Sequence, residues 1–138
     1  MQDKFKWSDK YLVGIKKIDD QHKKIMSLYN ELAIAIATKQ SRETLYKVLT
    51  EIIDNSLEHF VTEEKTFTEI KFPESYEHSL SHDAFRSEAE RLLQEMGKGI
   101  LEIDDSLVNF LESWIEVHIK LEDAKYADFI EDNKLKDY

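Results

Sequence analysis

Apolar side chains recur at intervals of three and four residues along four long stretches of the chain. The third stretch has the cleanest pattern, with inward positions at His78, His82, Phe85, Ala89, Leu92 and Met96. Such spacing places one face of an α-helix against a core. No stretch shows the sustained alternation that is typical of a half-buried strand. The pattern therefore predicts long helices over about 19–38, 42–65, 74–96 and 105–123, and a shorter one over about 124–132.

Residues that start or stop helices lie between these stretches. Ser41 can cap the start of the second predicted helix, and Asp104 or Asp105 the start of the fourth. Pro73 separates the second helix from the third, because proline suits only the first turn of a helix. Gly97 is suited to the end of the third helix. The connections between helices are therefore short.

The composition fits a single helical domain over residues 1–138. The chain has only 3 glycines and 1 proline, and 35% of its residues are charged, a balance typical of helices. Long helices with short connections predict an all-α fold, an up-down-up-down antiparallel four-helix bundle. We expect an N-terminal arm over residues 1–18, pinned to the bundle by Trp7, and a short C-terminal helix.

Charge and residue usage exclude several classes of function. The net charge of −10 repels phosphate backbones and anionic lipid surfaces, so we expect no nucleic-acid partner. No run of about 18 apolar residues occurs, so we expect no insertion into a membrane. The chain contains no cysteine, which excludes disulfides, iron–sulfur clusters and thiol catalysis. The start of the chain lacks the pattern of a secretory signal, so we expect a cytoplasmic protein.

All five histidines of the chain fall on the inward stripes: His22, His59, His78, His82 and His118. Buried imidazoles need polar partners, and their spacing indicates metal binding. His78 and His82 are four residues apart, so both rings project from one face of a helix. His59 and Glu63 have the same spacing and place an imidazole beside a carboxylate. All four long helices contribute, as in metal sites built within helix bundles.

Asp123 is the least regular candidate ligand. It lies five residues after His118, which is a rotation of about 140° in an ideal helix. Either its side chain reaches round to the histidines, or the helix loosens at this point. Glu64 follows Glu63 and is rotated from it by about 100°, so we expect Glu64 to face solvent.

The candidate ligands are too numerous for one metal ion. Five imidazoles and two carboxylates exceed what an octahedral ion can hold with room for chemistry. Two ions fit if both carboxylates bridge them, and an oxo or hydroxo bridge would then leave one position open. Without thiolates, this donor set suits iron, manganese or zinc. Ligand type does not choose between iron and zinc, but two close ions with an open position favour iron and O2 chemistry.

Four segments together resemble the hemerythrin family, specifically its single-domain bacteriohemerythrins. They are residues 14–22 (GIKKIDDQH), 59–64 (HFVTEE), 72–82 (FPESYEHSLSH) and 114–123 (WIEVHIKLED). The resemblance implies a four-helix bundle with a non-haem di-iron site that binds O2 reversibly. The family pattern assigns His22 and His59 to the iron that binds O2. It assigns the remaining three histidines to the other iron: His78, His82 and His118. Glu63 and Asp123, together with an oxo or hydroxo group, are then the bridges between the two irons.

Apolar residues near His118 are candidates for the walls of an O2 pocket. Trp114, Ile115 and Ile119 flank this histidine, and Phe60 is a further candidate. An apolar wall would keep protons and water away from the bound ligand. The same side chains could equally serve only to pack the core.

Two other functions would use the same residues. One is a di-iron enzyme, such as an oxidase, a peroxidase or a nitric oxide scavenger, and the other is a structural or zinc-stabilised bundle. Carboxylate-rich di-iron enzymes carry O2 further, to cleavage, whereas a histidine-rich site should stop at reversible binding. We therefore expect an oxygen carrier, store, scavenger or stand-alone sensor, and not an enzyme.

Overall fold

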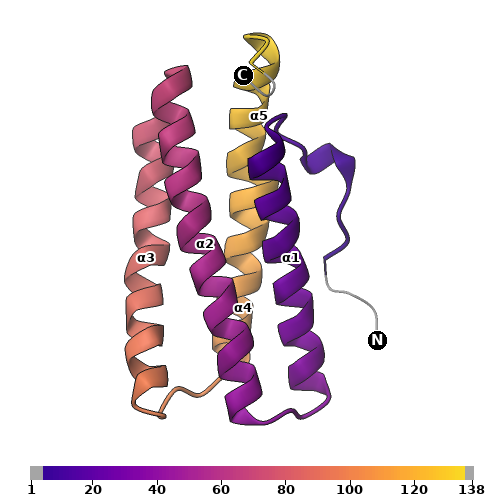
Figure 1. The fold of residues 1–138 in the computed structure, drawn as a ribbon, viewed down its shortest axis with the longest axis vertical. Helices are drawn as coiled ribbons and strands as arrows, with labels where there is room; N and C mark the ends of the chain where they lie inside the picture. The colour runs from indigo at the N-terminus through magenta and orange to yellow at the C-terminus, as the bar shows by residue number, and fades with distance from the viewer. Residues whose placement is uncertain (1–4, 136–138) are drawn as a thin grey trace.

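The computed structural model describes residues 5–135 and contains four long helical rods that lie side by side (Figure 1). Successive rods run in opposite directions, and the described residues form no strand. No helix among them is long and apolar enough to cross a membrane. The helical elements are η1 (Asp9–Tyr11), α1 (Lys16–Ala37), α2 (Arg42–Ile70), α3 (Ser75–Gly97), α4 (Asp105–Ile115), the π-helical segment η2 (Glu116–Glu122) and α5 (Asp123–Asp132). The predicted all-α four-helix bundle is confirmed.

Side-chain caps begin two of the long helices. The Ser41 hydroxyl accepts a hydrogen bond from the Thr44 amide at 3.1 Å, and the Asp104 carboxylate accepts one from the Leu107 amide at 3.0 Å. Each cap satisfies a backbone donor that has no partner within the helix. Of the two aspartates considered for the start of α4, the structure selects Asp104.

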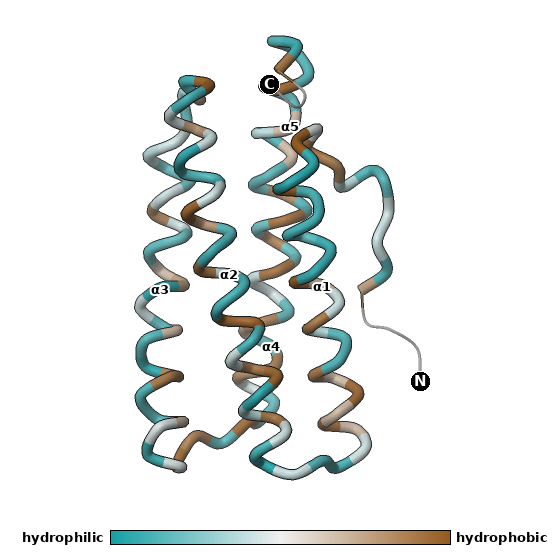
Figure 2. The backbone as a smooth tube through the Cα atoms, in the orientation of Figure 1, coloured by the Kyte–Doolittle hydropathy of each residue, from teal (hydrophilic) through white to brown (hydrophobic). Residues whose placement is uncertain are grey.

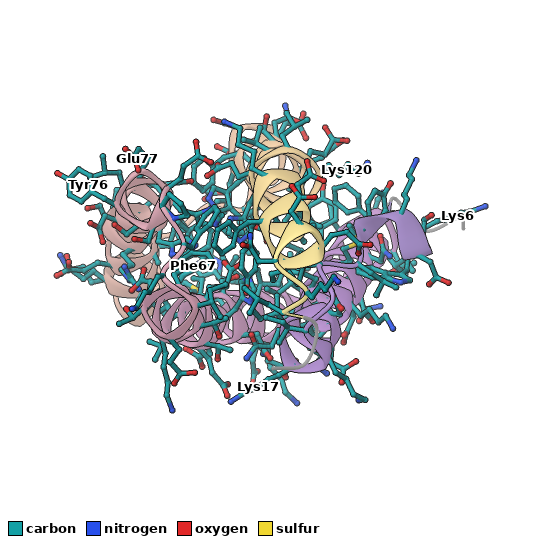
Figure 3. The ribbon with its side chains drawn as sticks, turned by 90° about the horizontal axis from the view of Figure 1, so that it is seen from above. Lys6, Lys17, Phe67, Tyr76, Glu77 and Lys120 are labelled. Atoms are coloured by element: carbon teal, nitrogen blue, oxygen red, sulfur yellow. The ribbon has the colours of Figure 1, made fainter. Side chains whose placement is uncertain are left out.

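The second helix is longer than its pattern indicated. It extends to Ile70 and ends at Lys71, which has a left-handed φ of 58°. Phe67 and Ile70 are buried in the extra turn, so the apolar stripe continues beyond the predicted end. This turn places Phe67 at one end of the bundle interior, as the view from above shows (Figure 3).

The fourth rod is continuous from residue 105 to residue 132 and has no break after residue 123. Its middle section, η2, is a π-helix, in which backbone hydrogen bonds span five residues. The Asp123 amide donates to the His118 carbonyl, so Asp123 follows His118 by about one turn. Of the two arrangements considered for Asp123, the structure adopts the loosened helix.

The buried apolar side chains form two separate clusters. Figure 2 shows that hydrophobic and hydrophilic positions interchange along every helix of the bundle. One includes Leu49 and Leu111, and the other includes Ile18 and Tyr126. On three rods a polar candidate lies between members of the two clusters: His22 between Ile18 and Ile25, Glu63 between Phe60 and Phe67, and Asp123 between Ile119 and Tyr126. The core therefore consists of a polar layer between two apolar ones.

The N-terminal arm runs beside α1 (Figure 1) and is held there by specific contacts. The Phe5 amide donates to the Asn30 side chain, and the Asn30 amide donates back to the Phe5 carbonyl, both at 2.8 Å. The Phe5 ring also packs edge-on against Tyr29, with centroids 5.2 Å apart. Trp7 packs against the edge of the core, as expected for a residue that pins the arm.

The Asn30 contacts predict that the arm contributes to stability. We expect Asn30→Ala to lower the free energy of unfolding by about 1–3 kcal/mol, because two buried backbone groups of Phe5 lose their partners. Asn55→Ala is a suitable control, since the Asn55 side chain donates a hydrogen bond within its own helix, to the Glu51 carbonyl. Urea unfolding of the metal-free protein measures both changes. If the two variants lost equal amounts of unfolding free energy, a specific role for Asn30 would be contradicted.

Candidate metal centre

The structure brings all seven candidate ligands into one buried layer. They come from every rod of the bundle: His22 on α1, His59 and Glu63 on α2, His78 and His82 on α3, His118 on η2, and Asp123 on α5. Six of these residues are completely buried, and His78 is 6% exposed. The side chains that the sequence spacing singled out therefore lie together in the structure.

One oxygen of Glu63 lies at the centre of the cluster. Glu63 Oε1 is 3.0 Å from His59 Nε2, 3.1 Å from His82 Nε2 and 3.2 Å from His118 Nε2. His78 Nε2 lies slightly further away, at 3.7 Å. The imidazole rings from three rods thus point the same nitrogen at one carboxylate oxygen.

Asp123 occupies the other side of the same layer. Its Oδ2 is 2.7 Å from His22 Nε2 and 3.5 Å from His118 Nε2, and its Oδ1 is 3.0 Å from His78 Nε2. His22 Nε2 and His59 Nε2 are themselves only 2.9 Å apart. The Nε2 atom of every histidine in the cluster therefore lies within about one hydrogen-bond length of a carboxylate or another imidazole.

Hydrogen bonding alone does not satisfy this layer. Glu63 Oε2, His78 Nε2 and both oxygens of Asp123 are buried and make no properly aligned hydrogen bond. Buried polar atoms normally have partners, and a cation between them would supply one. The donor atoms form two overlapping groups, and within each group all donor atoms lie within 4.8 Å of one another. The first group is His22, His59, Glu63, His118 and Asp123. The second group is Glu63, His78, His82 and His118. The residues present therefore fit two metal positions.

The electrostatics favour ionised carboxylates at the centre. Burial raises the pKa of Glu63, but its electrostatic interactions and hydrogen bonds with His59 and His118 outweigh burial and hold this pKa well below its usual value. Burial and the neighbouring Glu63 raise the pKa of Asp123, yet His118 and His22 lower it more. Both carboxylates are thus ready to bind a cation.

His59 and His78 differ in their protonation state at neutral pH. Burial lowers the pKa of His59 to about 4, so this ring is neutral at neutral pH, as a metal ligand must be. Burial also disfavours the charged form of His78, but Asp123 and Glu63 raise its pKa to about 10. Without metal, His78 therefore carries a proton that a bound cation would displace.

Two residues outside the predicted set hold imidazole rings from behind. His59 Nδ1 donates to Gln21 Oε1 at 2.8 Å, and His82 Nδ1 donates to Glu64 Oε2 at 2.7 Å. A proton on Nδ1 leaves the Nε2 lone pair directed at the centre, which is how such partners orient metal-binding histidines. The expectation that Glu64 faces solvent is wrong, because His82 and Arg86 both bond to its side chain.

The sequence indicates only in part that Gln21 and Glu64 contribute to the site. Gln21 directly precedes His22, and Glu64 directly follows Glu63, but neighbours along a helix point in different directions. Each of them orients a histidine on a different helix from its own. Their partners could not be read from spacing along one helix.

Aromatic rings enclose the histidines. Phe60 stacks on His82, with centroids 4.1 Å apart and planes at 15°, and Trp114 stacks on His118 at 4.7 Å and 11°. Phe60 and Trp114 contact each other edge-on at 5.4 Å. Phe67 meets His78 from the opposite end at 4.8 Å. The layer is therefore shielded by apolar surface on both sides.

The residues predicted to form an O2 pocket lie in this apolar surround. Ile115 and Ile119 are buried in the core cluster that also contains Phe60, and the half-buried Trp114 packs against that cluster. Their contribution to O2 binding stays a prediction.

The fold and the donor set define a metal-binding four-helix bundle. The model of the hemerythrin HHE cation binding domain matches residues 13–130. A bacteriohemerythrin of Stenotrophomonas maltophilia is 33% identical over 124 residues, covering 88% of this chain and 78% of the relative. A hemerythrin-like protein of Naegleria gruberi is 30% identical over 122 residues, covering 88% and 90%. The chain belongs to the hemerythrin family.

Solved structures agree with this assignment. A wild-type hemerythrin crystal structure superposes with a TM-score of 0.81 at 25% sequence identity, covering 91% of this chain and 96% of the other. The resemblance that the four sequence segments indicated is confirmed. A cluster of histidines and carboxylates able to hold metal is likewise present.

The contact between Glu64 and His82 predicts an effect on metal affinity. Glu64→Gln keeps the side-chain length but removes the charge that orients the ring, so we expect affinity to fall by about 10-fold or more. Competition with a chelator measures it. Glu58→Gln changes an exposed residue of the same helix and should leave affinity unchanged. Equal affinities in the two variants would show that His82 does not depend on Glu64.

Proposed function

We propose that this chain binds O2 reversibly at a non-haem di-iron centre held by the seven buried residues: His22, His59, Glu63, His78, His82, His118 and Asp123. The observation that carries the proposal is the convergence of five imidazole nitrogens on two buried carboxylates, three of whose four oxygens (Glu63 Oε2 and both of Asp123) lack aligned hydrogen-bond partners. Two iron ions, when bound, supply the electrons and the open coordination position that reversible O2 binding needs.

The two overlapping donor groups support the division of ligands that the family pattern implies. His22 and His59 belong only to the first group, and His78 and His82 only to the second. Glu63 and His118 belong to both groups. A carboxylate has two oxygens with which to bridge two ions, whereas His118 directs only its Nε2 at the layer, so Glu63 is the better candidate for a bridge. Asp123 lies close to His22 with one oxygen and to His78 with the other, so it reaches both positions as well.

The character of the donors supports binding rather than turnover. The protein contributes only two negative charges, from Glu63 and Asp123, and the remaining donors are imidazoles. A histidine-rich centre is less able to drive cleavage of O2 than a carboxylate-rich one. Phe60 and Trp114 cover the rings of His82 and His118 and limit the access of water. We therefore propose an oxygen carrier, store, scavenger or sensor.

Metal content and the visible spectrum test this function directly. We expect about two irons per chain after full anaerobic reconstitution, since two donor groups are present. Air should produce a coloured oxygenated form that bleaches reversibly on deoxygenation. Turnover of a substrate or peroxide would favour a di-iron enzyme instead. A firm content of one iron, or colourless protein, would contradict the proposal.

The position of Ile119 predicts an effect on the lifetime of the oxygenated form. Ile119→Ala opens space next to His118, admits water and protons, and should speed autoxidation while iron content stays normal. The decay of the oxygenated absorption band at equal iron loading measures this rate.

The matched control for Ile119→Ala is Ile53→Ala, another fully buried isoleucine of the same core cluster. Both substitutions should cost about 2–5 kcal/mol of stability through lost packing. Only Ile119→Ala should speed the decay. If the two variants decay equally, Ile119 serves only to pack the core and does not line an O2 pocket.

A further inference from the structure

A small cleft connects the surface to the polar layer at the end of the bundle where α2 passes into α3. Its volume is about 80 Å³, and it lies between the first turn of α3 and the junction of η2 with α5. Figure 3 looks down on this end, with Glu77 on the outer side of α3 and Phe67 toward the interior of the bundle. The walls of this cleft, the His78 cleft, are Phe72, Glu74, Glu77, His78, Glu122 and Lys125.

His78 is the point at which the cluster reaches the surface. The other six candidate ligands are completely buried, whereas His78 is 6% exposed and lines the cleft. Its Nε2 is buried, makes no aligned hydrogen bond, and lies 3.0 Å from Asp123 Oδ1. A solute that passes through the cleft therefore meets a ligand of the centre first.

The walls of the His78 cleft favour a cation. Glu74, Glu77 and Glu122 contribute three carboxylates, and Lys125 contributes one positive charge. Glu77 lies in the first turn of α3, where an acid also suits the helix dipole. That explanation does not apply to Glu122, which lies at the end of η2 and is held by a 2.9 Å hydrogen bond from the Ser81 hydroxyl. Acids from two rods thus converge on one opening.

We propose that the His78 cleft is the route by which a divalent metal ion reaches the buried centre. This proposal rests on the metal-binding role proposed above. The cleft has room for only a few water molecules, so an ion must shed part of its hydration shell to pass. Carboxylate oxygens are suitable replacements for those waters. Glu74, Glu77 and Glu122 therefore act as transient ligands, and His78 receives the ion from them.

The rate of iron uptake by the metal-free protein tests this route. Fe(II) is added anaerobically, and unbound iron is captured with a colorimetric chelator at timed intervals. We expect the double variant Glu74→Gln/Glu77→Gln to load about 10-fold more slowly at low ionic strength, because electrostatic focusing at a charged opening raises association rates by that order. The final iron content should equal that of the unmodified protein, and added salt should narrow the difference in rate.

A matched control separates the route from general effects of charge. Glu43→Gln/Asp105→Asn removes two exposed acids from the first turns of α2 and α4, which begin at the opposite end of the bundle (Figure 1). The net charge changes equally in the two double variants. The control should load at the unmodified rate, and Lys125→Gln, which removes the lysine charge from the cleft, should load faster.

The outcomes distinguish this proposal from the proposed function. Slow loading in Glu74→Gln/Glu77→Gln alone, with full final iron content, supports the route. Equal rates in the two double variants, or a lower final iron content in the cleft variant, would overturn it. The proposed function would still stand in either case if the unmodified protein binds two irons. Failure of the unmodified protein to retain iron at all would instead contradict the proposed function.

Discussion

Two fully buried carboxylates determine how the rest of this bundle is arranged. Glu63 and Asp123 are completely buried, and an ionised carboxylate in an apolar interior is stable only beside compensating charge or donors. The five imidazoles provide such partners, and a pair of cations would provide stronger ones. Each rod must therefore present its polar residues at the same height as the others. The apolar clusters on either side of this layer fix that height through packing.

The π-helical segment η2 is a local consequence of the same requirement. A regular helix would rotate Asp123 away from His118, whereas the hydrogen bond between their backbones spans five residues and returns Asp123 to the polar layer. The segment gives up regular α-helical bonding over seven residues. It also aligns Glu122 with the surface cleft beside His78. The π-helical segment thus positions both Asp123 in the buried layer and Glu122 at the His78 cleft.

The bonds that orient the rings also tie the rods together. Gln21 on α1 bonds to His59 and to Thr62 on α2, and Glu64 on α2 bonds to His82 and Arg86 on α3. These contacts restrict rotation of the imidazoles and resist sliding of one helix along the next. Because one set of contacts carries both roles, metal affinity and the register of the bundle are expected to change together.

The sequence by itself determined the helices, their order and the ligand candidates, because these depend on spacing within a single helix. His78 and His82, for example, share a face by local geometry alone. The sequence left open how Asp123 joins the centre and misplaced Glu64 in solvent. Only the tertiary structure decided these points, since Asp123 depends on a π-helix that the polar layer requires, and Glu64 on a histidine brought to it by another helix. Contacts between helices depend on how the rods pack, and spacing along one chain does not encode that directly.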